Sequence, residues 1–177
     1  MLKKVVYQTK STLETIRIGK DIGRRLLPGA VVALVGDLGA GKTQFIKGLA
    51  AGVGIGNATY ISSPSFTLIH EYPGKIPFYH VDLFRLEKVE EAESLGLEDY
   101  FLGRGVMAIE WADRIPSLLP EEMLLVSMSY IDKDRRSIEI IGKGRRYEDL
   151  VNQVQSLELG VRRKKPKVNC EPAPPNE

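Results

Sequence analysis

The sequence predicts an α/β fold of three layers, with a central, mostly parallel sheet and antiparallel additions. The apolar run Ala30–Val35 has the composition of a strand buried on both faces of a parallel sheet. A glycine-rich turn and a helical segment follow it directly, which is the order that opens a β-α-β unit. Further along, the apolar segments Leu124–Tyr130 and Ser137–Ile141 flank a charged turn, as expected of an antiparallel hairpin.

Two helices and a strand surround this first apolar run. Residues 3–8 form a short β-branched segment that predicts a strand. Ser11 and Thr12 precede apolar residues at helical spacing, so we expect a capped helix there that ends at Pro28-Gly29. A second helix is predicted over Lys42–Val53, broken by Gly52, Gly54 and Gly56.

The second half of the chain alternates between extended and helical patterns. Pro73-Gly74 predicts a turn between two extended stretches. The further elements that we expect are extended segments at 65–72 and 76–82, an acidic helix at 87–95, a buried strand at 106–111 and a closing helix at 147–157.

Length and composition predict one domain with an appended tail. The chain has 177 residues and is 43% apolar, which is enough for one substantial core. We expect one domain at residues 1–160 and a basic, proline-rich tail at residues 161–177. The tail carries a net charge of +3 and leaves −1 on the body, so any RNA contact would be weak and local to the tail. Its composition predicts disorder.

Several classes of protein are excluded by what the sequence lacks. No apolar run approaches the roughly 18–20 residues of a membrane span, and the N-terminus leads into no signal-peptide core. The single cysteine, Cys170, forms neither an internal disulfide nor a multi-cysteine metal site. We therefore expect a soluble, cytoplasmic protein without membrane contact.

The strongest chemical signal is the run GDLGAGKT at Gly36–Thr43, which matches the full phosphate-loop pattern G-x-x-x-x-G-K-[ST]. It lies after an apolar strand and opens a helix, which is the context that the motif requires. Glycines let successive backbone N–H groups approach a phosphate. Lys42 is expected to bridge the β- and γ-phosphates, and the Thr43 hydroxyl to face Mg²⁺. The alternative is a glycine turn that fits the pattern by chance.

Two acids end apolar strands and are candidate partners of the metal. Asp82 ends one such run and Glu110 ends another. The carboxyl ends of parallel strands line the ligand crevice of an open α/β sheet, so both acids can face Mg²⁺ there. Either acid alone is more often a solvated charge. The phosphate loop in the same chain favours the metal role.

Other polar and aromatic residues carry weaker signals. We interpret His80 and His70 as packed or hydrogen-bonded histidines, because phosphoryl transfer does not need a histidine base. The hydroxyl-rich loop at 63–67 is either a switch-like segment or a plain turn. Trp111 is by default a core or rim aromatic. Arg135 and its neighbour at a hairpin tip are ordinarily solvated turn charges.

Four motifs in this order resemble the bacterial TsaE family: GDLGAGKT, SPSFTL, YHVDLFRL and IEWADR. Members of this family are small P-loop ATPases of tRNA threonylcarbamoyladenosine (t6A) biosynthesis. The phosphate loop alone is shared with many NTPases, but the four motifs together are specific. The resemblance covers approximately residues 11–141 and implies a P-loop NTPase-type fold, with ATP and Mg²⁺ as ligands.

The resemblance also implies roles for individual residues. Lys42, Asp82 and Glu110 would be catalytic, Thr43 and Glu110 would hold Mg²⁺, and Asp82 would act at the metal or the γ-phosphate. Trp111 matches a mobile tryptophan of the family. Ser65 stands where a threonine is common, which keeps the hydroxyl but loses the methyl group. The residues implied to bind the nucleotide are Thr12, Gly39, Ala40, Gly41, Lys42, Thr43, Asp82 and Arg135.

The family resemblance finally implies partners. Its members join a TsaB–TsaD heterodimer in which TsaD transfers the threonylcarbamoyl group to an adenosine beside the tRNA anticodon, and ATP hydrolysis would reset that complex. Other functions of a phosphate loop stay open at this point: a small-molecule or nucleoside kinase, and a nucleotide-gated binding module that does not hydrolyse. A GTPase is disfavoured because the chain has no Asn-Lys-x-Asp motif.

Overall fold

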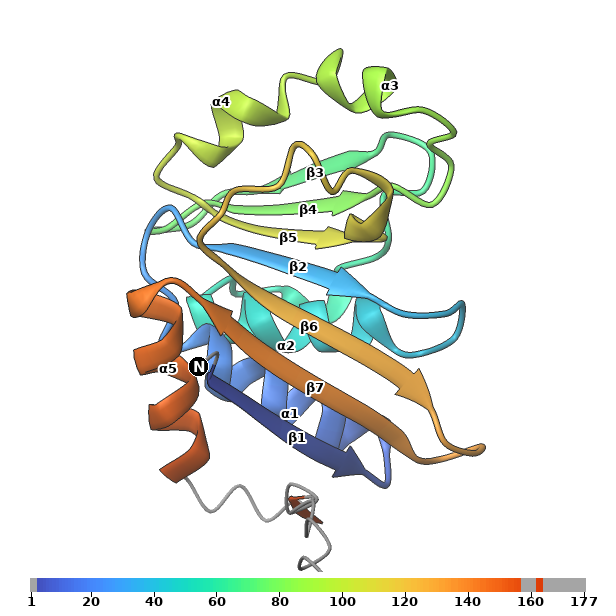
Figure 1. The fold of residues 1–177 in the computed structure, drawn as a ribbon, viewed down its shortest axis with the longest axis vertical. Helices are drawn as coiled ribbons and strands as arrows, with labels where there is room; N and C mark the ends of the chain where they lie inside the picture. Colours follow the sequence, from blue (N-terminus) through green and yellow to red (C-terminus); the bar gives the residue numbers. More distant parts are fainter. Residues whose placement is uncertain (1–2, 157–161, 164–177) are drawn as a thin grey trace, which may run out of the picture.

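A computed structural model describes residues 3–156 and 162–163, whose strands form one sheet (Figure 1). The spatial order is β3-β4-β5-β2-β6-β7-β1-β8. The four strands β4, β5, β2 and β6 run parallel to one another, while the outer strands are antiparallel to their neighbours. The strands are β1 Lys3–Thr9, β2 Val31–Val35, β3 Ile69–Tyr72, β4 Phe78–Asp82, β5 Val106–Glu110, β6 Met123–Tyr130, β7 Arg136–Lys143 and β8 Arg162–Arg163.

Helices pack on both faces of this sheet. One face carries α1, α2 and α5, and the other carries the short helices α3, α4 and η2 (Figure 1). The prediction of a three-layer α/β fold with a mostly parallel centre and antiparallel additions is confirmed. The helices are α1 Thr12–Gly23, α2 Lys42–Val53, η1 Ala58–Tyr60, α3 Val89–Glu93, α4 Leu97–Phe101, η2 Ala112–Arg114 and α5 Arg145–Ser156.

The central strand β2 explains why the sequence contains an uninterrupted apolar run. Its side chains alternate between the two layers: Val32 and Leu34 pack in the cluster beneath the long helices, and Val31 and Ala33 pack in the cluster on the opposite face. All four side chains are buried. A strand covered on both faces has no solvated side, so no polar residue interrupts it.

Helix α1 begins where the sequence predicts. The Ser11 hydroxyl oxygen accepts a hydrogen bond from the Glu14 backbone N–H at 3.2 Å, and the Glu14 carboxylate accepts one from the Lys10 N–H at 2.7 Å. Such reciprocal bonds satisfy backbone donors that have no partner inside the helix. The start of α1 is therefore fixed by local chemistry.

Helices α1 and α2 touch through their backbones at four glycines. A Cβ atom on Gly48 would lie 2.2 Å from the Ile16 carbonyl oxygen, and one on Gly19 would lie 2.3 Å from that of Phe45. One turn further along both helices, Gly23 and Gly52 repeat this close approach. Because the contacts advance along both helices together, the helices run parallel and both begin at the same end of the sheet.

The first and last described elements lie together at the edge of the sheet that β1 and β8 form. Strand β1 pairs with β7 and with the two-residue strand β8. The Tyr7 hydroxyl donates to the Val154 carbonyl of α5 at 3.1 Å, and the Gln155 amide donates to the Lys4 carbonyl. The first strand is thus completed by elements from the C-terminal part of the chain.

Several boundaries differ from those predicted. The helix expected at 87–95 is the shorter α3, at Val89–Glu93, and an additional short helix, α4, follows Gly96, which adopts a left-handed conformation with φ +66°. Only Ile69–Tyr72 of the extended stretch expected at 65–72 is a strand. Helix α2 has the predicted bounds; it continues through Gly52, which does not break it, and is capped by Gly54, with φ +105°. Each difference arises at a residue whose backbone conformation depends on its surroundings.

The tail is described at two residues only. Arg162–Arg163 of the segment expected to be disordered form β8 against β1. Residues 157–161 and 164–177, with the end of the predicted closing helix and Cys170, lie outside the described residues. Within the described residues, no helix combines the length and the apolar character needed to cross a bilayer.

The close contact at Gly48 predicts that replacing this glycine by alanine lowers stability, which is opposite to the usual effect in a helix. In an exposed helix, Gly→Ala stabilises by about 1 kcal/mol, but Gly48→Ala is expected to destabilise this protein by about 1–3 kcal/mol because the added methyl overpacks the Ile16 carbonyl. Urea unfolding measures the change. Gly56→Ala is the control, since a Cβ there meets no atom within 4 Å. Equal midpoints for Gly48→Ala and the unmodified chain would contradict the backbone contact.

Candidate functional site

A cavity of about 530 Å³ lies at the carboxyl ends of the parallel strands. Five segments line it: the phosphate loop, the start of α1, the hydroxyl-rich loop before β3, the residues after β4 and β5, and the tip of the β6–β7 hairpin. The segments come from both halves of the chain. The cavity therefore exists only in the folded domain, at the edge of the sheet where parallel α/β proteins bind ligands.

The phosphate loop is shaped by glycines that no other residue can replace without strain. Gly36 has φ +138°, and a Cβ there would lie 2.1 Å from the Met128 carbonyl oxygen of β6. Gly41 has φ +97° and forms the N-cap of α2. Ala40 is fully buried and does not line the cavity, and its backbone N–H donates to the Asp37 carbonyl oxygen at 3.1 Å. The loop thus presents backbone N–H groups at a helix N-terminus, which is an anion-binding geometry.

Lys42 lies at the centre of this loop. Its ammonium group donates to the carbonyl oxygens of Gly36 and Asp37, the latter at 2.9 Å, and lies 3.9 Å from the centroid of the Trp111 ring. Burial lowers the pKa of Lys42, and the nearby carboxylates of Glu110 and Asp82 oppose this shift. The side chain is 4% exposed. A cation is thus held at the floor of the cavity by neutral carbonyls and an aromatic face.

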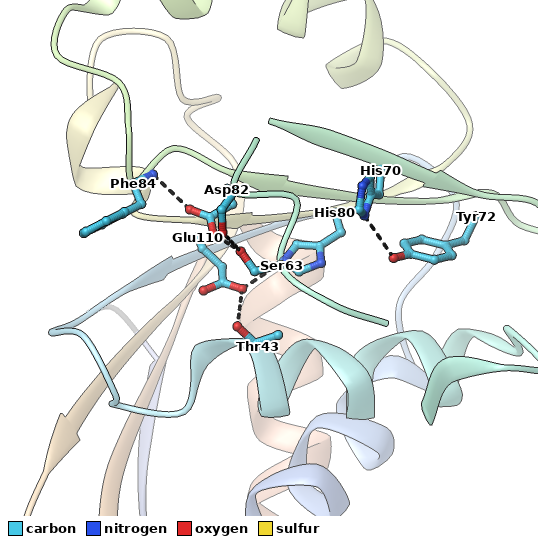
Figure 2. A network of polar contacts seen from close by, with 9 residues as sticks. Thr43, Ser63, His70, Tyr72, His80, Asp82, Phe84 and Glu110 are labelled. Atoms are coloured by element: carbon cyan, nitrogen blue, oxygen red, sulfur yellow. Dashed lines mark hydrogen bonds and ion pairs between the residues drawn. The ribbon is translucent and has the colours of Figure 1, made fainter. Parts of the chain in front are cut away.

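The two predicted acids lie side by side. Strands β4 and β5 are parallel neighbours, and their register pairs Asp82 directly with Glu110. Both residues are buried to 4% exposure. Figure 2 shows that Glu110 accepts two hydrogen bonds on the same oxygen, Oε1: one from the Thr43 hydroxyl at 2.8 Å and one from His80 Nε2 at 2.9 Å.

Asp82 is held by the hydroxyl-rich loop. The Ser63 hydroxyl donates to Asp82 Oδ2, and the Phe84 backbone N–H donates to Oδ1 at 2.9 Å (Figure 2). The Ser65 hydroxyl lies 2.8 Å from that of Ser63. The loop is thus part of the site, although the motif SPSFTL by itself left it as either a switch-like segment or a plain turn. Ser63 and Ser65 both line the cavity.

The remaining predicted site residues are divided between the cavity and its surroundings. Thr12, Gly39, Gly41 and Thr43 line the cavity. Arg135 does not: its guanidinium pairs with Asp132 within the hairpin turn. The same hairpin contributes other charged side chains to the lining, namely Lys133, Asp134 and Arg136.

Trp111, which the sequence predicts to be a core or rim aromatic, lines the cavity beside Phe84, a residue that sequence reasoning missed. Trp111 has φ +59°, a left-handed conformation that is strained for a bulky residue. Its ring packs 5.1 Å from that of Phe84, and both residues line the cavity. Phe84 follows Asp82 by two positions in the run YHVDLFRL, so its position after the strand end was the available signal.

Comparison with known proteins agrees with this arrangement. The family model described as "Threonylcarbamoyl adenosine biosynthesis protein TsaE" matches residues 9–138, which include the phosphate loop, both acids and most of the hairpin. The chain belongs to the TsaE family. The resemblance based on four motifs is thereby confirmed, and the family match covers nearly the whole cavity lining.

Individual relatives match the chain over most of their length. A tRNA threonylcarbamoyladenosine biosynthesis protein TsaE of Bacillus subtilis is 42% identical over 154 residues, covering 86% of this chain and 95% of the relative. The protein of the same name in Treponema pallidum is 41% identical, covering 75% and 96%. A crystal structure of Bacillus subtilis YdiB superimposes with a TM-score of 0.74 at 39% identity, covering 88% and 96%.

The position of Lys42 predicts how this TsaE-family cavity binds anions. Lys42→Met is expected to weaken the binding of inorganic tripolyphosphate by at least about tenfold, since charge-assisted hydrogen bonds contribute about 1.5–3 kcal/mol and 1.4 kcal/mol is a factor of about ten. Isothermal titration calorimetry measures the affinity. Lys47→Met, in the same helix but outside the lining, is the control. Equal affinities of the two variants would remove the phosphate role of Lys42.

Proposed function

We propose that this chain binds and hydrolyses ATP with Mg²⁺, and that this hydrolysis serves the t6A modification of tRNA together with a TsaB–TsaD heterodimer. The carrying observation is the convergence of Lys42, Thr43 and Glu110 in one cavity at a helix N-terminus. Relatives over most of the chain are named as tRNA threonylcarbamoyladenosine biosynthesis proteins. The proposed location is the cytoplasm.

The phosphate loop accounts for nucleotide binding. The backbone N–H groups of Gly39 to Thr43 and the positive end of the α2 dipole favour the phosphates. The Lys42 ammonium already lies among the loop carbonyls, so it needs little reordering to meet a phosphate oxygen. Thr12, at the start of the parallel helix α1, also lines the cavity, where it would contact the nucleotide.

The oxygen ligands that the site offers fit a magnesium ion. Mg²⁺ binds through one or two carboxylates, a hydroxyl and phosphate oxygens, with water completing its coordination. The Thr43 hydroxyl and the Glu110 carboxylate are in contact, and Asp82 is the neighbouring acid. Thr43 and Glu110 would hold the metal, which neutralises charge on the phosphate oxygens when bound.

The remaining contacts order the groups around the γ-phosphate. Asp82 accepts hydrogen bonds from Ser63 and from the Phe84 N–H, which fix the orientation of its carboxylate. Asp82 can therefore hold a water molecule or a water ligand of the metal in a fixed orientation. Through Ser63, a change in the hydroxyl-rich loop changes the position of this carboxylate.

The arginines of the lining are engaged in other contacts. The Arg85 guanidinium lies 4.3 Å from the centroid of the Phe66 ring, and Arg136 donates to backbone carbonyls of the hairpin turn, including that of Asp132. Transition-state charge in many P-loop enzymes is neutralised by an arginine that a partner supplies. We therefore propose that the heterodimer completes the site, with a weak tRNA contact through the basic tail.

The proposed metal role of Glu110 is tested by removing the negative charge of its side chain. Glu110→Gln keeps the shape but removes the charge, so it is expected to raise the Mg²⁺ concentration for half-maximal ATP hydrolysis by at least about tenfold. A phosphate-release assay across a magnesium series measures this. Glu87→Gln, an exposed acid before α3, is the matched control. Identical magnesium dependence in both variants would show that Glu110 does not bind the metal.

The partner role is tested by initial rates. The purified chain is expected to hydrolyse ATP slowly and to be stimulated markedly by TsaB–TsaD, because completion of a P-loop site by a partner raises rates by about 10³–10⁵-fold in other systems. Phosphate release is compared for the chain alone, with the heterodimer and with a panel of small-molecule acceptors. A phosphorylated acceptor without stimulation by the heterodimer would favour the kinase alternative.

A further inference from the structure

His80 occupies a place in the site that the proposed hydrolysis does not yet use. The residue is fully buried in β4, and its Nε2 atom lies 2.9 Å from Glu110 Oε1. The strand register explains this reach. His80 pairs with Ala108 of β5, and Glu110 follows Ala108 by two residues on the same face of that strand. The small alanine side chain leaves room for the imidazole to extend diagonally toward the carboxylate.

The contacts determine which ring nitrogen carries the proton. Glu110 Oε1 already accepts the Thr43 hydroxyl, and a carboxylate oxygen only accepts, so His80 Nε2 must donate. His80 Nδ1 is buried and has no hydrogen-bond partner among the described residues. The geometry therefore places a proton on Nε2, where it is donated to Glu110.

Two donors on one oxygen leave the other oxygen of Glu110 to a ligand. Thr43 and His80 both contact Oε1, and Oε2 accepts no hydrogen bond from the described residues. Figure 2 shows Oε2 pointing away from both donors. The hydrogen bond from His80 orients the carboxylate through Oε1 alone.

We propose that His80 is a positioning residue for magnesium: its Nε2–H group fixes Oε1 of Glu110 and thereby aims Oε2 at the metal. This inference rests on the proposed Mg²⁺ role of Glu110. His80 itself touches neither metal nor nucleotide. Its effect passes through Glu110 alone, so it changes magnesium affinity and leaves the phosphate contacts of the loop intact.

The tautomer is tested on the unmodified, ¹⁵N-labelled chain without metal. The chain has two histidines, and His70→Gln assigns their signals in long-range ¹H–¹⁵N spectra. The expected result at pH 7.5 is a proton on Nε2 of His80. A proton on Nδ1 alone would overturn the proposal, because Nε2 would then have no hydrogen to donate to Glu110.

The positioning role is tested with two substitutions and a control. His80→Phe keeps a planar ring without a donor, His80→Gln keeps an N–H donor, and His70→Phe changes the cross-strand neighbour, which contacts Tyr72. Binding of a fluorescent ATP analogue is titrated with and without Mg²⁺. His80→Phe is expected to raise the Mg²⁺ concentration for half-maximal tightening about 10–100-fold, with metal-free affinity unchanged. His80→Gln restores most of the loss, and His70→Phe matches the unmodified chain.

The outcomes separate this inference from the proposed function. If Mg²⁺ fails to tighten binding even in the unmodified chain, the magnesium role itself is wrong. If Mg²⁺ acts normally on the unmodified chain and equally on a folded His80→Phe, or if a folded His80→Gln is as defective as His80→Phe, the positioning role is wrong. Should His80→Phe fail to fold, the glutamine variant and the tautomer measurement decide.

Discussion

The backbone contact between α1 and α2 decides where the functional cavity lies. Four glycines let the two helices approach until carbonyl oxygens of one helix meet Cα atoms of the other. Each glycine lowers helix propensity by about 1 kcal/mol relative to alanine, so this closeness is obtained against local preference. The helices are parallel and begin at Thr12 and Lys42, so their positive dipole ends meet at one edge of the sheet. An anion is favoured there by both helices.

The sheet complements this positive edge with negative charge at a fixed distance. Parallel pairing of β4 and β5 sets Asp82 beside Glu110, and the apolar layers on both faces allow no shift in this register. The core thus positions both acids. Side-chain donors then hold them: Thr43 of α2 and His80 of β4 contact Glu110, and Ser63 of the hydroxyl-rich loop contacts Asp82. The site is rigid on the sheet side and adjustable on the loop side.

The sequence predicts the parts of this site that depend on local chemistry. The apolar run before Gly36, the phosphate loop and the N-cap at Ser11 each follow from neighbouring residues, and the four motifs lead to the family. The bond between His80 and Glu110 could not be predicted, because it depends on strand register across 30 positions. Arg135 and Arg136 show the same limit: the conformation of the hairpin turn decides which of the two lines the cavity. A GxxxG spacing in each helix was the overlooked sign of the helix contact.

The pairing of β1 has a consequence for how the chain is made. A ribosome releases the N-terminus first, so residues 3–9 emerge long before β7 and α5, which pair with or pack against them. Until residues 136–156 have left the exit tunnel, β1 is a β-branched strand with no partner from its own sheet. The central parallel strands can assemble earlier, whereas the β1 edge closes only after residues 136–156 have emerged. In that interval, β1 is open to capture by chaperones or by other nascent chains.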